Sequence, residues 1–253
     1  MNPLDDKIHW LLRLGDSALI QGQRLCEWCG HAPAIEEELA LMNVGLDLIG
    51  QARNWYEYAV VLLADGRTAD DLALRRDDRS FRNLLLVEQP NGDYAVTMAR
   101  QFFYDAWHHA ALSGMAASRD EHIAAIAGKA LKEVTYHLTR SAEWVQRLGD
   151  GTEVSHQRMC AAVERLWRFT FELTEVDDAQ ARLAASGIIG NPAQRAEAWN
   201  ATVALVCEKA TVPLPAPAVP NYLSGRNGLH TEHLGPLLAE MQYLQRAYPD
   251  ARW

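Results

Sequence analysis

The sequence predicts an all-α protein, and three observations support this. Apolar residues recur at steps of three and four through most of the chain, whereas no segment of useful length alternates like a strand. Four consecutive helical stretches of about 25 residues are joined by short connections, as in antiparallel bundles. The chain has 253 residues, of which 49% are apolar, enough for one sizeable core. We therefore predict a single domain over residues 1–253, an antiparallel four-helix bundle with additional C-terminal helices.

The first two helices are expected over residues 5–28 and 34–64. Apolar residues of the first recur at helical steps, and Gly30 and Pro33 follow it. Three glutamates in the first turn of the second helix suit the positive end of the helix dipole. Gly66 is its expected C-terminal cap. The highly charged residues 67–80 are expected to form a surface excursion, followed by a short apolar segment at 81–87.

Capping residues mark the next helices. The turn at 90–92 precedes Asp93, which can cap a third helix ending near Ser118. Asp120 can cap a fourth helix that ends near Leu148. A fifth helix is predicted from about Ser155 to Leu173. All three assignments rest on helical apolar spacing that follows the capping residue or turn.

The C-terminal third gives weaker signals. After residues 177–178 the pattern fades, and residues 187–192 break the chain. A sixth helix fits residues 192–210, with Pro192 at an early position. Residues 212–228 hold four prolines and cannot be helical; a loop of this length is typical of a binding or lid element. A last helix fits residues 232–248.

Composition and charge exclude several classes of function. The net charge of −9 would repel nucleic acid and anionic membranes, so neither is an expected partner. The N-terminus lacks the order of a secretory signal, and the longest apolar run, near residues 59–64, is too short to cross a bilayer. Cys26 and Cys29 form a lone C-x-x-C without the second pair of a zinc ribbon. We expect a reduced, cytoplasmic protein.

Each of the four long helical stretches carries one carboxylate among apolar residues. These are Asp16, Asp47, Asp105 and Glu133, and in a bundle all four could converge in the interior. Buried carboxylates must be neutralised by metal, by cationic or hydrogen-bonding partners, or by protons. His108, His137, Arg53, Arg100, Arg140 and Lys129 are the partners available in the same helices.

The spacing argues against iron. Di-iron bundles supply a Glu from each of two helices and a Glu-x-x-His from each of the other two. Here Gly50 stands three residues after Asp47, and Tyr136 three residues after Glu133. His137 is displaced by one residue, about 100° around the helix. Asp105 and His108 have suitable spacing but stand alone. We therefore predict a polar core network, with no catalytic, cofactor-binding or metal-binding residue.

Two further clusters contain histidine. Glu153 and His156 form the one true Glu-x-x-His, at a turn where local capping is the expected role. His230, Glu232 and His233 lie beside the proline-rich loop, where hydrogen bonding or interface contacts are expected. A metal role stays open for both clusters. The eight tryptophans are expected in the core or at subunit interfaces.

Five sequence blocks resemble a known family. They are residues 14–16, Glu27-Trp28-Cys29-Gly30-His31-Ala32-Pro33, Leu46-Asp47-Leu48-Ile49-Gly50-Gln51-Ala52-Arg53, residues 83–92 and Gly228-Leu229-His230-Thr231-Glu232-His233-Leu234-Gly235-Pro236. Together they are similar to the structural, C-type subunits of bacterial phenylacetyl-CoA epoxidases. The resemblance extends from the first helix to the C-terminus.

The resemblance implies a ferritin-like subunit that pairs with a related catalytic subunit, which carries the di-iron site and the acyl-CoA pocket. That complex, supplied with electrons by a reductase, inserts one oxygen atom of O₂ into the aromatic ring of phenylacetyl-CoA during aerobic phenylacetate breakdown. Structural subunits of the family have lost iron ligands, in agreement with Gly50 and Tyr136 here.

The leading hypothesis is a non-catalytic scaffold of this oxygenase, able to self-associate when alone. The second is an oxidase active in its own right, with iron held by Asp16, Asp105, His108, Glu133 and His137. The third is an acyl-CoA or small-molecule binding module, which the acidic charge disfavours.

Overall fold

The computed structural model describes residues 3–220, 222–249 and 251. It confirms the all-α prediction, since these residues contain helices and a single isolated bridge, between Ser224 and Leu229. Contacts group the chain into two compact units, Met1–Pro90 with Asn221–Trp253, and Asn91–Pro220. The single domain over residues 1–253 stays a prediction. Among the described residues, no helix has both the length and the apolar content needed to cross a bilayer.

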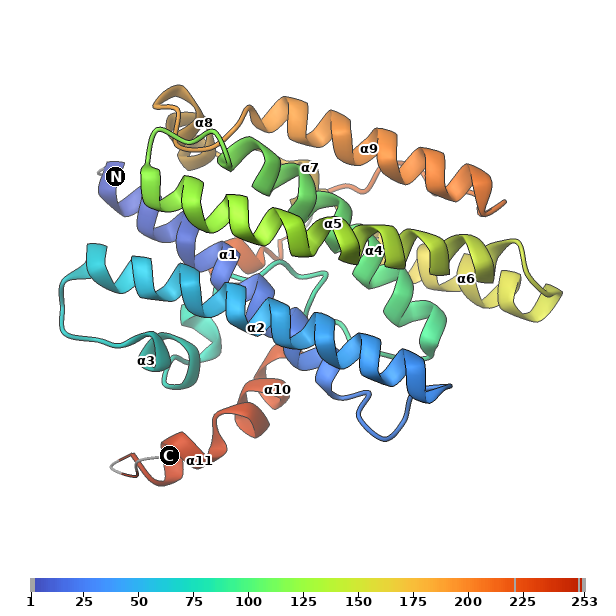
Figure 1. Ribbon diagram of the computed structural model, residues 1–253, viewed down its shortest axis with the longest axis horizontal. Helices are drawn as coiled ribbons and strands as arrows, with labels where there is room; N and C mark the ends of the chain where they lie inside the picture. Colours follow the sequence, from blue (N-terminus) through green and yellow to red (C-terminus); the bar gives the residue numbers. More distant parts are fainter. Residues whose placement is uncertain (1–2, 221, 250, 252–253) are drawn as a thin grey trace. The chain divides into compact units, whose positions relative to one another are not determined.

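The first unit is built on an antiparallel helix pair, α1 (Pro3–Cys26) and α2 (Ile35–Leu63), which lie side by side in blue and cyan in Figure 1. Small residues allow the two helices to approach closely. A Cβ atom added at Gly22 would lie 3.0 Å from the carbonyl oxygen of Gly45, and one at Gly45 would lie 3.1 Å from Cys26 Sγ. The predicted ends are nearly right, but the left-handed cap of α2 is Ala64 (φ 50°) instead of Gly66.

The charged segment after α2 lies mostly at the surface, as predicted, but it also forms short helices and buries two side chains. It contains α3 (Ala69–Leu74) and the short 3₁₀ helix η1 (Asp78–Ser80). Thr68 and Asp71 form a capping box at the start of α3. Leu72 and Arg76 are buried although exposed charges surround them in the sequence. The six residues of α3 are too few to show a helical period in the sequence.

The C-terminal part of the first unit holds η2 (Gly225–Asn227), α10 (Leu234–Met241) and α11 (Tyr243–Ala247). The single helix predicted over residues 232–248 is therefore two helices. Gln242 lies between them, and its buried side chain donates to the carbonyl oxygens of Ala73 (3.1 Å) and Arg76 (3.0 Å). These tertiary hydrogen bonds cannot be seen in the local sequence.

The second unit contains the other long pair, α4 (Tyr94–Met115) and α5 (Glu121–Gly149), which pack against each other (Figure 1). Asp93 and Asp120 cap them through the backbone N–H groups of Val96 and of residues 122–123, which confirms both predicted caps. Nearly every residue of α4 from position 95 to 108 is buried. This helix therefore forms the centre of the unit's core.

Five shorter segments complete the second unit. They are α6 (Glu153–Trp167), α7 (Phe171–Thr174), α8 (Asp178–Ala185), α9 (Pro192–Lys209) and the part of the proline-rich loop up to Pro220. The predicted fifth helix is thus interrupted between α6 and α7, and α8 was not predicted. Trp199 and Phe103 meet in the core, while Trp167 Nε1 donates to the carbonyl of Ala216 in the loop (2.7 Å).

Candidate functional site

Asp16 on α1 is completely buried and surrounded by hydrogen-bond donors. Tyr56 Oη donates to its carboxylate at 2.6 Å, and the backbone N–H of Arg82 donates at 2.7 Å. The Arg76 guanidinium forms two further bonds, one of them at 3.1 Å. A Cβ atom added at Gly15 would lie 2.6 Å from the Tyr56 ring, so glycine lets this ring reach the carboxylate. Asp16 thus has a full positive charge as its partner.

Arg76 is held on the other side by Phe81 and by backbone oxygens. Its guanidinium carbon lies 4.4 Å from the centre of the Phe81 ring, and Nη1 donates to the carbonyl of Ser80 at 3.0 Å. Burial alone would lower the pKa of Arg76, but the Asp16 carboxylate and Tyr56 outweigh burial and raise it. Burial and the neighbouring Asp16 raise the pKa of Tyr56 well above its ordinary value. Arg76 is therefore charged and Tyr56 neutral.

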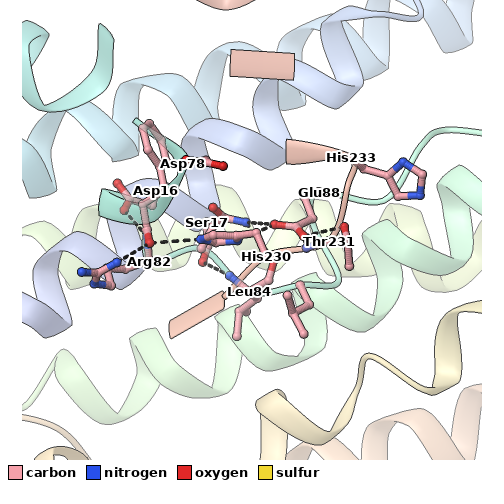
Figure 2. A network of polar contacts seen from close by, with 12 residues as sticks. Asp16, Ser17, Asp78, Arg82, Leu84, Glu88, His230, Thr231 and His233 are labelled. Carbon is pink, nitrogen blue, oxygen red and sulfur yellow. Dashed lines mark hydrogen bonds and ion pairs between the residues drawn. The ribbon is translucent and has the colours of Figure 1, made fainter. Parts of the chain in front are cut away.

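Glu88 forms a second buried network in the same unit, shown in Figure 2. Its Oε2 accepts from Asn83 Nδ2 (2.8 Å) and contacts His230 Nδ1 (2.7 Å), while its Oε1 accepts from the N–H (2.7 Å) and hydroxyl (2.6 Å) of Thr231. His230 Nε2 lies 3.1 Å from the carbonyl oxygen of Phe81. The two ring nitrogens of His230 thus lie between the Glu88 carboxylate and a backbone carbonyl oxygen. The network joins residues 81–89 to the 228–236 segment.

The predicted interface residues differ in accessibility. The side chain of His230 is only 5% exposed, whereas those of Glu232 and His233 are 83% and 33% exposed. The main chain of His233 is also held, because Arg24 Nη2 donates to its carbonyl oxygen at 3.3 Å. The interface role of all three residues stays a prediction. Glu232 and His233 have the accessible side chains.

Asp105 on α4 is also completely buried, but its neighbours are neutral donors. Gln101 Nε2 donates to Oδ1 at 2.6 Å, and Ser141 Oγ of α5 lies 2.8 Å from Oδ2. Burial raises the pKa of Asp105 to about 8, although these two hydrogen bonds and the charge of Arg140 oppose the rise. Ser141 Oγ also lies 3.3 Å from the carbonyl of Leu138. With a pKa of about 8, the carboxyl group of Asp105 is largely protonated at neutral pH.

His108 follows Asp105 by one helical turn and is also fully buried. Its ring centre lies 5.0 Å from that of Tyr104 and 6.2 Å from that of Trp107. Burial, then the nearby His137 and His109, lower the pKa of His108 to about 3. In the part of the chain that the structure describes, neither nitrogen of His108 nor the hydroxyl of Tyr104 has a hydrogen-bond partner. His108 is therefore a neutral core residue.

The other predicted positions differ in burial, and only His137 among them is buried. Asp47 and Glu133 are half-buried, Gly50 is exposed, Tyr136 is 56% exposed and His137 is buried. The predicted partners Arg53 and Arg100 bind elsewhere, to Glu57 (2.8 Å) and Asn91 (2.6 Å). The partner of Asp16 is instead Arg76, which sequence reasoning missed because it placed residues 67–80 on the surface.

These residues do not fit a metal centre. Residues 3–220, 222–249 and 251 contain no group of three or more His, Cys, Asp or Glu side chains placed to hold a metal ion. At Asp16 the Arg76 guanidinium already occupies the carboxylate, and its charge would repel a second cation. A protonated Asp105 would have to lose its proton before it could ligate. The absence of a metal from this chain stays a prediction.

Comparison with known proteins identifies the relatives of this chain. A family model described as "Phenylacetic acid catabolic protein" matches residues 2–253. The chain belongs to this family. It is 52% identical over 244 residues to the C subunit of 1,2-phenylacetyl-CoA epoxidase from Escherichia coli (strain K12), an alignment that covers 96% of this chain and 98% of the relative. The resemblance deduced from the sequence blocks and the all-α, ferritin-like class are both confirmed.

Proposed function

We propose that this chain is a non-catalytic structural subunit of a multicomponent oxygenase that epoxidises the ring of phenylacetyl-CoA. In this proposal it binds and stabilises a homologous catalytic subunit, which holds the di-iron cofactor and receives electrons from a reductase subunit. The full-length similarity to the C subunit of a phenylacetyl-CoA epoxidase supports the substrate class and the assembly. The chain itself would hold no cofactor.

The single observation that carries the non-catalytic role is how the buried carboxylates are neutralised. Asp16 has Arg76 as its counter-ion, and Asp105 has a raised pKa and neutral hydrogen-bond partners. Both carboxyl groups are therefore neutralised without a metal ion, one by Arg76 and the other by a bound proton. A metal ion would have to displace an arginine in one place and a proton in the other, so the polar residues support a scaffold better than a catalytic centre.

An exposed apolar stripe on α2 supports a protein partner. Ile35, Leu39 and Leu46 are 71%, 56% and 61% exposed. Their spacing of four and seven residues places them within about 40° of one another around the helix. Large apolar side chains clustered on one exposed face are typical of protein interaction sites. We propose that this stripe, together with the exposed Glu232 and His233, is covered by the catalytic partner.

Co-purification tests the proposal. The tagged chain is co-expressed with the catalytic partner, and we expect the two to elute together from an affinity column and from gel filtration. A Leu39→Glu, Leu46→Glu double variant should lose the partner while keeping its own melting temperature. A matched control is Leu205→Glu on α9, at a site 52% exposed, which should retain the partner. A chain that never co-elutes would contradict the scaffold function.

An oxidase active in its own right is the second candidate, favoured by one observation. His108 follows Asp105 at ligand spacing and has both nitrogens unpartnered within the described residues. Iron analysis of the chain purified alone separates the two functions. The scaffold function predicts far less than one iron per chain, whereas about two irons, lost in Asp105→Ala and Glu133→Ala variants, would establish the oxidase.

A further inference from the structure

The one Glu-x-x-His pair of the chain is not used by the proposed function, and its histidine lies beside a cysteine. His156 and Cys160 are one turn apart on α6, and Cys160 Sγ lies 3.4 Å from His156 Nε2. Both residues are half-buried, so small reagents can reach them. Capping, which the sequence suggested for Glu153 and His156, is instead performed by Thr152 and Ser155. The Glu153 carboxylate accepts a hydrogen bond from Gln157 at 2.6 Å.

A backbone carbonyl fixes which nitrogen of His156 carries the proton. His156 Nδ1 lies 2.7 Å from the carbonyl oxygen of Gly149, the last residue of α5. A carbonyl only accepts, so Nδ1 is the protonated nitrogen of the neutral ring. The lone pair of Nε2 therefore faces the Cys160 thiol. A nucleophile, a base within hydrogen-bond reach and a third group that orients the base together form the pattern of an activated nucleophile.

We propose that Cys160 is a reactive thiol for small carbon electrophiles and that His156 is the base that receives its proton. In the reaction with iodoacetamide, the S–H bond breaks and the proton moves to His156 Nε2. Sγ then forms a bond to the methylene carbon, and the carbon–iodine bond breaks to release iodide. Proton, electron pair and leaving group are thereby accounted for. This site is independent of the proposed scaffold function.

Two neighbouring effects keep the thiol protonated until an electrophile arrives. Burial raises the pKa of Cys160, and the negative charge of Glu153 raises it further. Without a base, such a thiol would be slow, because the thiolate is the nucleophile. Reaction at neutral pH therefore depends on His156, and removal of the Glu153 charge should accelerate it.

The other cysteines provide internal references. Cys29 is exposed, whereas Cys207 is buried and burial raises the pKa of its thiol to about 11. In the full-length chain under native conditions, reaction with iodoacetamide can be followed for each cysteine by mass spectrometry of tryptic peptides. Cys29 gives the rate of a solvent-exposed thiol, and reaction of Cys207 would show that the fold has opened.

The decisive variant is His156→Asn. The asparagine amide can still donate to the Gly149 carbonyl, but it offers no base near Cys160. At pH 7.5 we expect Cys160 to react roughly tenfold more slowly, at the low end of what a positioned base contributes, while Cys29 keeps its rate. Glu153→Gln should raise the Cys160 rate about twofold, as one solvent-screened neighbouring charge would. Glu197→Gln on α9 is the matched control and should change nothing.

Three outcomes would overturn the assignment. One is an unchanged Cys160 rate in His156→Asn. Another is an equal slowing of Cys29 and Cys160, which would report a change of the whole fold. The third is a Cys160 rate no faster than that of Cys207 in the unmodified chain. Cys160→Ser must abolish the signal assigned to the Cys160 peptide.

Discussion

Asp16 and Asp105 are both buried carboxylates on long helices, one in each compact unit, yet their surroundings differ. Asp16 faces the Arg76 guanidinium, the Tyr56 hydroxyl and a backbone N–H. Asp105 meets the amide of Gln101 and the hydroxyl of Ser141, and burial raises its pKa to about 8. The first carboxylate is neutralised by a charge and the second by a proton. The two buried carboxyl groups are thus neutralised in two different ways.

The difference shows that burial of a carboxylate does not by itself determine how the group affects stability. An ion pair stabilises only while both partners are present, because removal of either leaves a buried charge. A protonated acid behaves as a neutral hydrogen-bonding group, and it becomes costly only when it ionises. Mutations and pH should therefore affect the two sites in opposite ways.

The largest effect is expected at the ion pair. Arg76→Met keeps an apolar stem but leaves Asp16 buried without its counter-ion, and the free energy of unfolding should fall by about 3–5 kcal/mol. Urea unfolding followed by circular dichroism measures this. Arg53→Met removes an arginine that is paired with Glu57 on the exposed surface, so it should leave the urea midpoint unchanged. Equal midpoints for both variants would contradict the charge-neutralised site.

The same substitution should give opposite results at the two carboxylates. Asp16→Asn leaves Arg76 uncompensated and should destabilise by about 2–3 kcal/mol. Asp105→Asn mimics the protonated acid, so its advantage in stability over the wild type should be smaller at pH 5 than at pH 8. Urea unfolding at pH 5, 6.5 and 8 makes the comparison.

The sign of the pH effect follows from the raised pKa of Asp105. Between its ordinary value of 3.8 and its folded value of about 8, the folded chain holds a proton that the unfolded chain has released. The contribution of Asp105 to the free energy of unfolding therefore falls as pH rises, by at most about 1.4 kcal/mol per unit, and levels off above pH 8. If the difference in unfolding free energy between wild type and Asp105→Asn stayed constant with pH, Asp105 would not be neutralised by a proton.

A smaller effect is expected at Glu88, which accepts from Asn83 and twice from Thr231 and also contacts His230. Glu88→Gln turns one acceptor into a donor that faces other donors, at a cost of about 2 kcal/mol. Amides of the 228–236 segment, that of Thr231 above all, should exchange faster with deuterium. Glu232→Gln changes an exposed glutamate of the same segment and is the control. Unchanged exchange in Glu88→Gln would mean that other contacts hold this segment.

The smallest effects on stability are expected when two glycines of the first unit are replaced by alanine. A Cβ atom at Gly22 would lie 3.0 Å from the Gly45 carbonyl oxygen, whereas one at Gly50 would meet nothing within 4 Å. Gly22→Ala should therefore destabilise by about 1–2 kcal/mol. Gly50→Ala should stabilise by up to about 1 kcal/mol, because alanine favours the helix. Thermal unfolding measures whether each substitution stabilises or destabilises the protein. If Gly22→Ala were stabilising, the helices α1 and α2 would not be in tight contact at Gly22.

Much of the fold could be predicted from the sequence alone. Helical apolar spacing located the four long helices, and Asp93 and Asp120 marked their starts because capping is a local interaction. Short helices were harder to predict, since α3 and α8 have only 6 and 8 residues, too few to show a clear helical period. The break at Gln242 was not predictable either, because its hydrogen bonds go to residues more than 160 positions away.

The sequence by itself also selected Asp16 and Asp105 as buried polar residues, showed that histidine ligands were missing at Gly50 and Tyr136, and indicated the family. Only the tertiary structure decided how each charge is neutralised. In the sequence Arg76 resembles the other arginines of a charged segment, and only folding brings it into contact with Asp16, which lies 60 positions earlier. Asp105 keeps its proton because burial excludes water. Sequence spacing records which residues share a helix face, whereas charge states depend on neighbours that only the folded chain brings together.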